Sequence, residues 1–384
     1  MKKIVILGAG ESGTGAAILA QSKGMDVFVS DRGTIAPMYQ ALLNQHQISW
    51  EEGQHTTDKI LAADEVIKSP GIPFSAPIVQ QLIAQATPII SEIEFAARYT
   101  QAKMICITGS NGKTVVKEWL YQLLAPHRRV TRSPRSYNSQ IGVPLSVWLL
   151  TPQTEVGIFE AGISQVGEMQ ALRAIVQPTI GIMTNIGEAH QENFATREEK
   201  CLEKLALFQD TEVLIYCADD KGAVETAEIA RHKRPDIQLI PYGENAAGDY
   251  HLEFGKVEDE KNKFKINLFK DCELYLSVPG KHEVLDAVAA TAMACELLTT
   301  DGKNPSDYKE NIKKGLAAFS GGKRRSEIIG KAFTNDGTSV VIIDDYGHHP
   351  TAVQTTLNGF RDFYKGRKII VDFMSHTYSR TQAL

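Results

Sequence analysis

The sequence predicts an α/β protein with doubly wound parallel sheets, because strand-like and helix-like runs alternate along almost its whole length. Several of the strand-like runs also end in glycine-rich turns that open a helix-patterned run. We expect strands at 3–7, 27–30, 65–68, 104–108, 156–160, 179–184, 213–217, 340–344 and 368–371, with a more antiparallel insert at 250–280.

The length and composition are those of an ordinary soluble protein. The chain has 384 residues, a formal charge of −5 and 43% hydrophobic residues, enough for two or three domains with their own cores. Basic residues form only short clusters such as 323–325, so we expect no nucleic-acid partner. No apolar run reaches the length of a membrane span, and the first run lacks a signal-peptide pattern. We therefore expect a cytoplasmic monomer with no membrane partner. The five scattered cysteines favour buried free thiols over a zinc site.

The stretch MICITGSNGKTVVKEW at 104–119 predicts a strand, a tight loop and the start of a helix. Glycines let the loop turn its N–H groups inward, and the helix N-terminus and Lys113 add positive charge. The Thr114 hydroxyl can ligate Mg²⁺. Together, these groups can hold the triphosphate of ATP. The match is the short form G-x-x-G-K-T, with Ile107 at the place of the usual first glycine, so an incidental glycine turn is the alternative. The candidate ATP-binding residues here are Gly109, Ser110, Asn111, Gly112, Lys113 and Thr114.

A second glycine loop, GAGESG at 8–13, follows the first expected strand and opens a helix. Asp31 ends the next strand at the distance that the dinucleotide fingerprint requires, so an NAD-dependent dehydrogenase is a legitimate alternative. A further turn, KSPGIP at 68–73, is expected on the same sheet edge, and two turns facing one crevice fit a UDP-linked ligand. Two purely structural turns are the competing interpretation. The candidate residues for the uridine nucleotide are Gly10, Glu11, Ser12, Gly13, Asp31, Arg32, Ser69, Pro70 and Gly71.

Three candidate residues lie in the middle of the chain. Glu160 ends a strand-like run, so its carboxylate is a Mg²⁺ ligand candidate beside Thr114 if the two strands are neighbours. His190 follows another strand, although a single loop histidine is more often a surface residue. Lys204 lies on the helix-patterned run REEKCLEKLALF, where a lysine alone is usually a solvated side chain.

Seven motifs follow one another along the chain: TGSNGKT, NSQIGVP, EAGISQVGEM, TNIGEAH, PGKHEVLDAVAA, FSGGKRRSE and DDYGHHP. In this order they resemble the Mur ligases, the ATP-dependent enzymes that form the amide bonds of the peptidoglycan peptide stem. Seven ordered matches are far more specific than any one of them. The resemblance implies a UDP-substrate-binding Rossmann-like domain at 1–100, a central P-loop ATP-binding domain at 101–321 and a partial, truncated Rossmann-like C-terminal ligase domain at 322–384.

The resemblance also implies roles for single residues. Lys113 and Thr114 would hold the ATP phosphates and a first Mg²⁺, whose shell Glu160 completes, and His190 would bind a second Mg²⁺. Lys204 is similar to the lysine that many members carry as a carbamate, an anionic oxygen ligand formed from a neutral amine and CO₂.

Further implied residues lie before and after this central group. Phe208 is the aromatic end of the K-x-x-x-[FY] pattern around Lys204, and Lys200 is the alternative lysine. Asn138 would contact the nucleotide-sugar substrate, and Arg325 and Asp345 would reach ATP.

The implied reaction begins with attack of a substrate carboxylate on the γ-phosphate, and an amino acid's amine then displaces phosphate from the acyl phosphate. The partners are a UDP-N-acetylmuramoyl nucleotide and a free amino acid. The N-terminal motifs are most similar to the D-glutamate-adding member, so the first expectation is addition of D-glutamate to UDP-N-acetylmuramoyl-L-alanine. Central motifs resemble the D-alanyl-D-alanine-adding member and C-terminal ones the L-alanine-adding member. Those additions are the alternatives, and the chain resembles a mosaic or an engineered chimera.

Three features depart from the family pattern. Glu283 and Asp286 stand where the family usually has asparagine, and two carboxylates near a nucleotide would repel phosphate. Met374 and Ser375 replace glutamine and proline of the resembling member, and the last domain is expected to be about half its usual length. A nucleotide-binding scaffold without turnover is therefore a second hypothesis.

Overall fold

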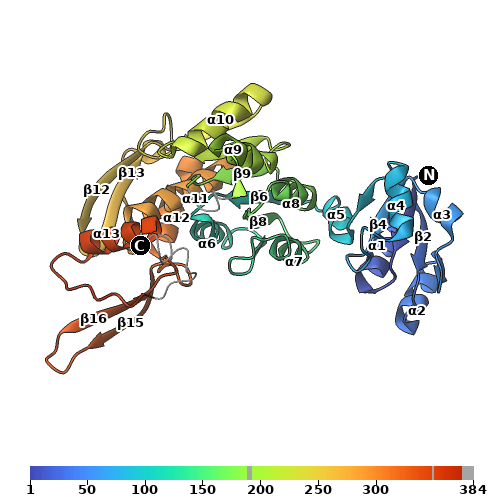
Figure 1. Cartoon of the computed structure of the whole chain (residues 1–384). Helices are drawn as coiled ribbons and strands as arrows, with labels where there is room; N and C mark the ends of the chain where they lie inside the picture. Colours follow the sequence, from blue (N-terminus) through green and yellow to red (C-terminus); the bar gives the residue numbers. More distant parts are fainter. Residues whose placement is uncertain (188–192, 348–349, 374–384) are drawn as a thin grey trace. The chain divides into compact units, whose positions relative to one another are not determined.

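The computed structural model describes residues 1–187, 193–347 and 350–373 and divides into two compact units, Met1–Thr100 and Gln101–Leu384 (Figure 1). His190, Met374 and Ser375 lie outside the described residues. Each unit is built around its own parallel sheet.

The first unit is a five-stranded parallel sheet in the order β3-β2-β1-β4-β5. Along β1, Ile4 and Ile6 enter one hydrophobic cluster while Val5 and Leu7 enter another, so both faces of the sheet are buried, as parallel sheets require. Its elements are β1 (Lys3–Leu7), α1 (Glu11–Ser22), β2 (Asp26–Asp31), α2 (Pro37–Gln45), β3 (Ser49–Glu52), α3 (Thr57–Leu61), β4 (Glu65–Lys68), α4 (Pro77–Ala84), β5 (Ile89–Ile90) and α5 (Glu92–Ala97).

Two turns of the first unit lie against each other at the carboxyl edge of this sheet. Gly8 has a φ of +100°, and a Cβ there would come within 2.8 Å of the Ser69 Cβ. A Cβ on Gly13 would lie 2.0 Å from the Gly8 carbonyl oxygen, so α1 can approach the turn after β1 only with glycine at this position. The two expected ligand-binding turns are therefore neighbours.

The second unit contains a six-stranded parallel sheet in the order β11-β10-β9-β6-β8-β7. The elements up to this sheet's last strand are β6 (Lys103–Thr108), α6 (Lys113–Leu124), β7 (Val130–Arg132), α7 (Gly142–Val147), β8 (Val156–Ala161), α8 (Glu168–Val176), β9 (Ile180–Met183), α9 (Arg197–Ala206), β10 (Val213–Cys217), α10 (Lys221–Lys233) and β11 (Gln238–Tyr242). The five cysteines are all buried and free, as expected.

A long alanine-rich helix, α11, packs along α6 and forms the centre of the second unit (Figure 1). Most residues of α11 are buried, and they cover all faces of the helix, which is typical of a helix in a protein core. Trp119 of α6 stacks on Phe319, with ring centroids 3.8 Å apart. The remaining elements are β12 (Leu252–Glu258), β13 (Lys261–Ile266), η2 (Asn267–Phe269), β14 (Leu274–Leu276), α11 (Lys281–Thr300), η3 (Pro305–Tyr308), α12 (Lys309–Ala317), β15 (Glu327–Phe333), β16 (Ser339–Asp344) and α13 (Pro350–Phe363).

The expected antiparallel insert is confirmed, because β12, β13 and β14 form an antiparallel sheet. The strand expected at 368–371 is wrong: β16 pairs with β15 as an antiparallel hairpin, and 368–371 forms no ladder with any described strand. Ile370 and Val371 are accordingly 83% and 52% exposed.

Substitution of Gly13 by alanine should destabilise the first unit, because its Cβ would overlap the backbone oxygen of Gly8. We expect a loss of about 2–3 kcal/mol in unfolding free energy. Gly15 on the same helix has no atom within 4 Å of an added Cβ, so Gly15→Ala is the matched control and should be neutral or stabilising by up to about 1 kcal/mol. Urea unfolding, monitored by hydrogen exchange of residues 1–100, measures the unfolding free energy of both variants. Equal unfolding free energies for Gly13→Ala and Gly15→Ala would contradict the packing described.

Candidate active site

The loop between β6 and α6 has a backbone that glycine makes possible. Gly109 and Gly112 have φ values of +151° and +83°, and Gly112 caps the N-terminus of α6 in the left-handed conformation. A Cβ on Gly109 would lie 1.9 Å from the Thr184 Oγ1, so the loop packs directly on the end of β9. The loop thus turns sharply and leaves the N-terminus of α6 at the carboxyl edge of the sheet.

Residues after β9 hold this loop in place. The backbone N–H groups of Ser110 and Asn111 donate to Asn185 Oδ1 at 3.0 and 2.9 Å, and the Thr184 hydroxyl donates to the Asn111 carbonyl at 2.6 Å. Asn185 therefore offers the loop amides an acceptor oxygen of the kind that a phosphate would provide. Asn185 belongs to the motif TNIGEAH, but the motif alone predicts no role for this residue. The signal was a short polar side chain at the end of a strand next to the loop.

Three lysines of the second unit interact electrostatically at this edge. Lys113 Nζ donates to the carbonyl of Gly109 at 2.6 Å, and burial lowers the pKa of Lys113 to about 8 although Glu160 opposes the shift. Burial, followed by the charges of Lys113 and Lys200, lowers the pKa of Lys204 well below its ordinary value. Lys204 is 2% exposed, and this burial shifts its protonation equilibrium toward the neutral amine.

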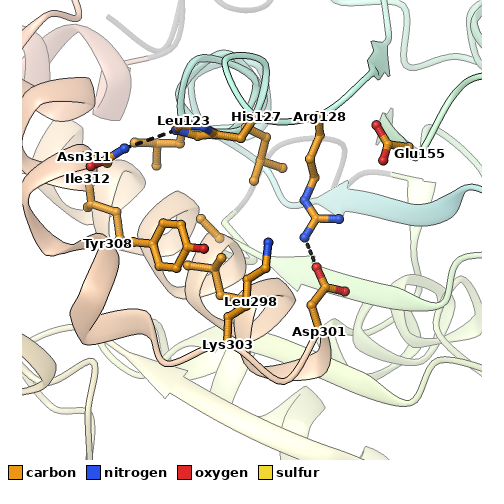
Figure 2. Close-up of a pocket in the computed structure, with 12 residues that line it drawn as sticks. Leu123, His127, Arg128, Glu155, Leu298, Asp301, Lys303, Tyr308, Asn311 and Ile312 are labelled. Atoms are coloured by element: carbon orange, nitrogen blue, oxygen red, sulfur yellow. Dashed lines mark hydrogen bonds and ion pairs between the residues drawn. The ribbon is translucent and has the colours of Figure 1, made fainter.

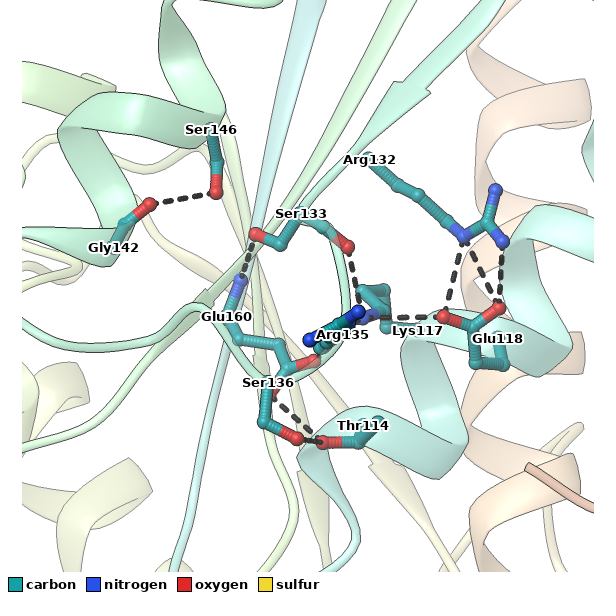
Figure 3. Close-up of polar contacts among 10 residues, drawn as sticks. All are labelled: Thr114, Lys117, Glu118, Arg132, Ser133, Arg135, Ser136, Gly142, Ser146 and Glu160. Atoms are coloured by element: carbon teal, nitrogen blue, oxygen red, sulfur yellow. Dashed lines mark hydrogen bonds and ion pairs between the residues drawn. The ribbon is translucent and has the colours of Figure 1, made fainter. Parts of the chain in front are cut away.

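Glu160 connects the loop helix to the neighbouring strand (Figure 3). Its Oε2 accepts from the Thr114 hydroxyl at 3.0 Å, and its Oε1 lies 2.8 Å from Lys117 Nζ, both side chains of this ion pair being fully buried. Thr114 also lies 3.1 Å from the Ser136 hydroxyl. The expected neighbourhood of Glu160 and Thr114 is thus present, whereas Lys117 and Ser136 were not found from the sequence because neither belongs to a recognisable pattern.

The oxygen set around Thr114 fits a Mg²⁺ ion, because a hydroxyl and a carboxylate already lie within hydrogen-bond distance. Among the described residues no group of three or more His, Cys, Asp and Glu side chains could hold a metal. A metal here would rest on Thr114, Glu160 and ligand phosphates. The second expected site depends on His190, which lies outside the described ranges.

Arg325 and Asp345 approach the same region from the C-terminal part of the second unit. Arg325 interacts electrostatically with Lys113 and with Asp286 of α11. Asp345 accepts from the N–H groups of Ser326 and Gly347 at 2.8 and 2.7 Å. The loop, the start of α11 and these two residues therefore surround one polar region.

Asn138 lies beside Gly162, whose N–H donates to the Asn138 carbonyl at 2.8 Å, just beyond the strand that carries Glu160.

The two residues expected around Lys204 have different surroundings. Lys200 Nζ donates to the Gly187 carbonyl at 2.7 Å. Phe208 is fully buried, and a Cβ on Gly181 of β9 would press against its ring. Phe208 is therefore a core residue that fixes the end of α9.

The candidate uridine-nucleotide residues gather around the two turns of the first unit. Asp31 accepts from the N–H groups of Ala9 and Gly33, each at 2.7 Å, so its carboxylate braces the glycine turn. The Ser12 hydroxyl donates to Glu92 at 3.1 Å. Ser69 is half-buried and Gly13 is buried, while the exposed members of the set are Gly10, Glu11, Arg32, Pro70 and Gly71. The exposed backbone of these turns is available to a ligand.

A separate cavity of about 330 Å³ lies at the opposite end of α6 (Figure 2). Leu123 and Leu124 close it on one side, and Arg128 is hydrogen-bonded to Asp301 at its edge. Because Lys113 begins α6 and Leu124 ends it, this cavity is far from the phosphate loop. The candidate site is thus defined by its polar groups and not by this cavity.

Three sequence profiles match the chain: Mur ligase MurD-like N-terminal domain at residues 2–91, Mur ligase middle domain at 107–294 and Mur ligase glutamate ligase domain at 324–382. The UDP-N-acetylmuramoylalanine--D-glutamate ligase of Bacteroides thetaiotaomicron is 38% identical over 349 residues, which cover 88% of this chain and 73% of that protein. The UDP-N-acetylmuramate--L-alanine ligase of Treponema pallidum strain Nichols is 39% identical over 210 residues, 53% of this chain and 42% of that protein.

The fold is also that of a solved structure. The MurF ligase of Thermotoga maritima in complex with ADP superposes with a TM-score of 0.58 at 19% identity, over 88% of this chain and 72% of that one. Within the described ranges no helix is both long and apolar enough to cross a membrane.

Replacing Lys117 by methionine should strongly destabilise the second unit, because it leaves the Glu160 carboxylate buried without its ion-pair partner. We expect a loss of about 3–5 kcal/mol in unfolding free energy. The control is Lys221→Met, which removes an exposed pair with Glu225 and should cost less than about 1 kcal/mol. Urea denaturation compares the two variants, and similar small losses would show that the Lys117–Glu160 pair contributes little.

Proposed function

The chain belongs to the Mur ligase family, and from this premise we propose that it is an ATP-dependent, ADP-forming ligase that adds D-glutamate to UDP-N-acetylmuramoyl-L-alanine. The observation that supports the nucleotide half of this proposal is the phosphate loop, with Lys113 and Thr114 at the N-terminus of α6 and Glu160 beside them. The acceptor half is supported by the relative at 38% identity, whose name gives this substrate and this amino acid.

The residues of the second unit suit phosphoryl transfer from ATP to a carboxylate. Such a reaction depends mainly on positioning and on neutralising charge, and little on covalent participation by the protein. Lys113 and the amides of the loop would hold the transferred phosphate, and Arg325 would add positive charge from the C-terminal side. Asn185 would have to yield the amides of Ser110 and Asn111 to phosphate oxygens when ATP binds.

Mg²⁺ would be held by Thr114 and Glu160 and would neutralise charge on the phosphates when bound. The chain's own contribution is to present a hydroxyl and a carboxylate at the carboxyl end of β8 and the start of α6. A second Mg²⁺ at His190 stays part of the proposal.

Lys204 is proposed to act as a carbamate. The lowered pKa of Lys204 favours loss of its ammonium proton, and a neutral amine is the form that reacts with CO₂. The carbamate would turn a buried amine among other cations into an anion that pairs with them.

The identity of the amino donor has alternatives to D-glutamate. The match to an L-alanine ligase covers 53% of this chain, which supports the mosaic interpretation and keeps L-alanine, with D-Ala-D-Ala, as an alternative amino donor. The profile matching residues 2–91 belongs to Mur ligases, which favours a UDP-linked ligand over a nicotinamide dinucleotide at the N-terminal turns.

A phosphate-release assay tests the proposal. Purified chain with ATP and Mg²⁺ should release phosphate when UDP-N-acetylmuramoyl-L-alanine and D-glutamate are both present. Release with UDP-N-acetylmuramate and L-alanine instead would replace the substrate assignment. Absence of stimulated release with every pair, from protein that still binds ATP, would favour the scaffold without turnover.

We predict that Lys204→Ala abolishes phosphate release, because no carbamate can form, and that bicarbonate does not restore it. Short-chain carboxylic acids should restore part of the activity, since they can place an oxygen anion in the space that the side chain leaves. Lys221→Ala, on the exposed face of α10, is the control and should be fully active. Full activity of Lys204→Ala without added acid would mean that Lys200 or no lysine has this role.

A further inference from the structure

The start of α11 places two carboxyl groups against the phosphate loop. A Cβ on Gly112 would come within 2.4 Å of Asp286 Oδ1, so the Asp286 carboxyl touches the loop backbone where α6 begins. Glu283, one turn earlier on the same helix, is 1% exposed. Among the described residues Glu283 Oε2 is buried without a hydrogen-bond partner. A buried acceptor without a donor is costly for an ionised carboxylate, so Glu283 is suited to the protonated form.

The protonation of this pair follows from burial. Burial raises the pKa of Asp286 to about 7, although Arg325 opposes the shift. Burial also raises the pKa of Glu283 well above its ordinary value, and the negative charges of Asp286 and Asp345 raise it further. Asp286 is therefore the member of the pair whose pKa lies near neutral pH, whereas burial and the neighbouring carboxylates favour the protonated form of Glu283.

Among the described residues, Arg325 is the cation whose charge favours the ionised form of Asp286. Within the part of the chain that the structure describes, the groups that interact electrostatically with Asp286 are Glu283 on its own helix, Arg325 from the C-terminal segment and Tyr242 of β11. Asp345 acts on Glu283 and on His282, and Lys113 interacts with Arg325. Burial lowers the pKa of His282, and Lys113 donates to the loop's own carbonyls. Arg325 is thus the main counter-charge to Asp286, and a bound nucleotide would compete for it.

We propose that nucleotide binding at the loop is coupled to uptake of one proton by Asp286, which sets the pH range in which the chain holds ATP. The inference rests on the proposed function, because it takes ATP or ADP as the ligand. An ionised Asp286 in contact with Gly112 would repel a polyphosphate, whereas a protonated Asp286 carries no charge and has an O–H to donate to a phosphate oxygen. The proton comes from solvent on binding and returns to solvent when the nucleotide leaves.

Titration calorimetry with Mg²⁺ and ADP tests the coupling without any variant. Binding heats in two buffers of different ionisation enthalpy count the protons that are exchanged. Above pH 7 Asp286 should contribute up to one proton taken up per nucleotide, and its ionisation should raise the dissociation constant by up to about tenfold per pH unit. Below pH 6 both effects should fade, because Asp286 is then protonated before binding.

The variant Asp286→Asn removes one titrating group and should bind ADP about tenfold more tightly than the parent at pH 8, while taking up about one proton fewer than the parent. Lys113, whose pKa is about 8, can still take up a proton at this pH in both proteins. Glu283→Gln should keep the uptake, since Asp286 remains. Glu296→Gln is the matched control: Glu296 lies on the same helix, has a raised pKa caused by burial and accepts from Tyr250 at 2.8 Å, away from the loop. It should leave the pH dependence unchanged.

The outcomes separate this inference from the proposed function. Nucleotide binding with no proton uptake, or the same uptake in Asp286→Asn, overturns the inference and leaves the ligase proposal intact. Failure of the folded protein to bind ADP at every pH overturns both.

Discussion

Three adjacent parallel strands, β8, β6 and β9, end at the same edge of one sheet, and the candidate site of the second unit depends on this constraint. Parallel pairing places the carboxyl end of β6, which opens the phosphate loop, between Glu160 on one side and Thr184 with Asn185 on the other. The hydrogen bond from Thr114 to Glu160 and those from the loop amides to Asn185 follow from this order of strands. A different order would separate the loop from both neighbours.

The electrostatics of this edge explain why it suits a polyphosphate. The cations at or near it are Lys113, Lys117, Lys200, Lys204 and Arg325, and one of the carboxylates among them, Glu160, is already paired with Lys117. The lowered pKa values of Lys113 and Lys204 follow mainly from their burial, to which neighbouring positive charges add. Phosphates, and a carbamate on Lys204, would supply the missing negative charge. Burial raises the pKa of both carboxyl groups at the start of α11, which lessens their repulsion of a phosphate.

Much of the fold could be predicted from the sequence, because buried parallel strands are short apolar runs and crossover helices separate them. The strands 65–68 and 213–217 have the bounds that were expected. The described strands β3, β5, β7, β11 and β15 were not expected. Two of them have a clear physical reason: β3 is the polar stretch SWEE, and β11 contains Pro241, which an edge strand tolerates. The strand expected at 368–371 has an apolar sequence but no partner among the described strands, and pairing cannot be judged from one segment alone.

The site was partly predictable for a similar reason. The loop residues and Glu160 belong to patterns with a known chemical use, so their types and places in the strands identified them. Lys117, Asn185 and Ser136 act through three-dimensional contacts across the loop, which no spacing along the chain reveals. The contact of Asp286 with Gly112 joins residues far apart in the sequence and appears only once α11 is packed against α6.

The central claim is that the loop 109–114 holds the phosphates of ATP. A crystal structure of the chain with Mg²⁺ and a non-hydrolysable ATP analogue tests it most directly. The account predicts phosphate oxygens on the amides that Asn185 now caps, Lys113 turned from the loop carbonyls to the phosphates, and the metal between Thr114 and Glu160. A nucleotide bound elsewhere, with Asn185 still on the loop amides, would contradict it.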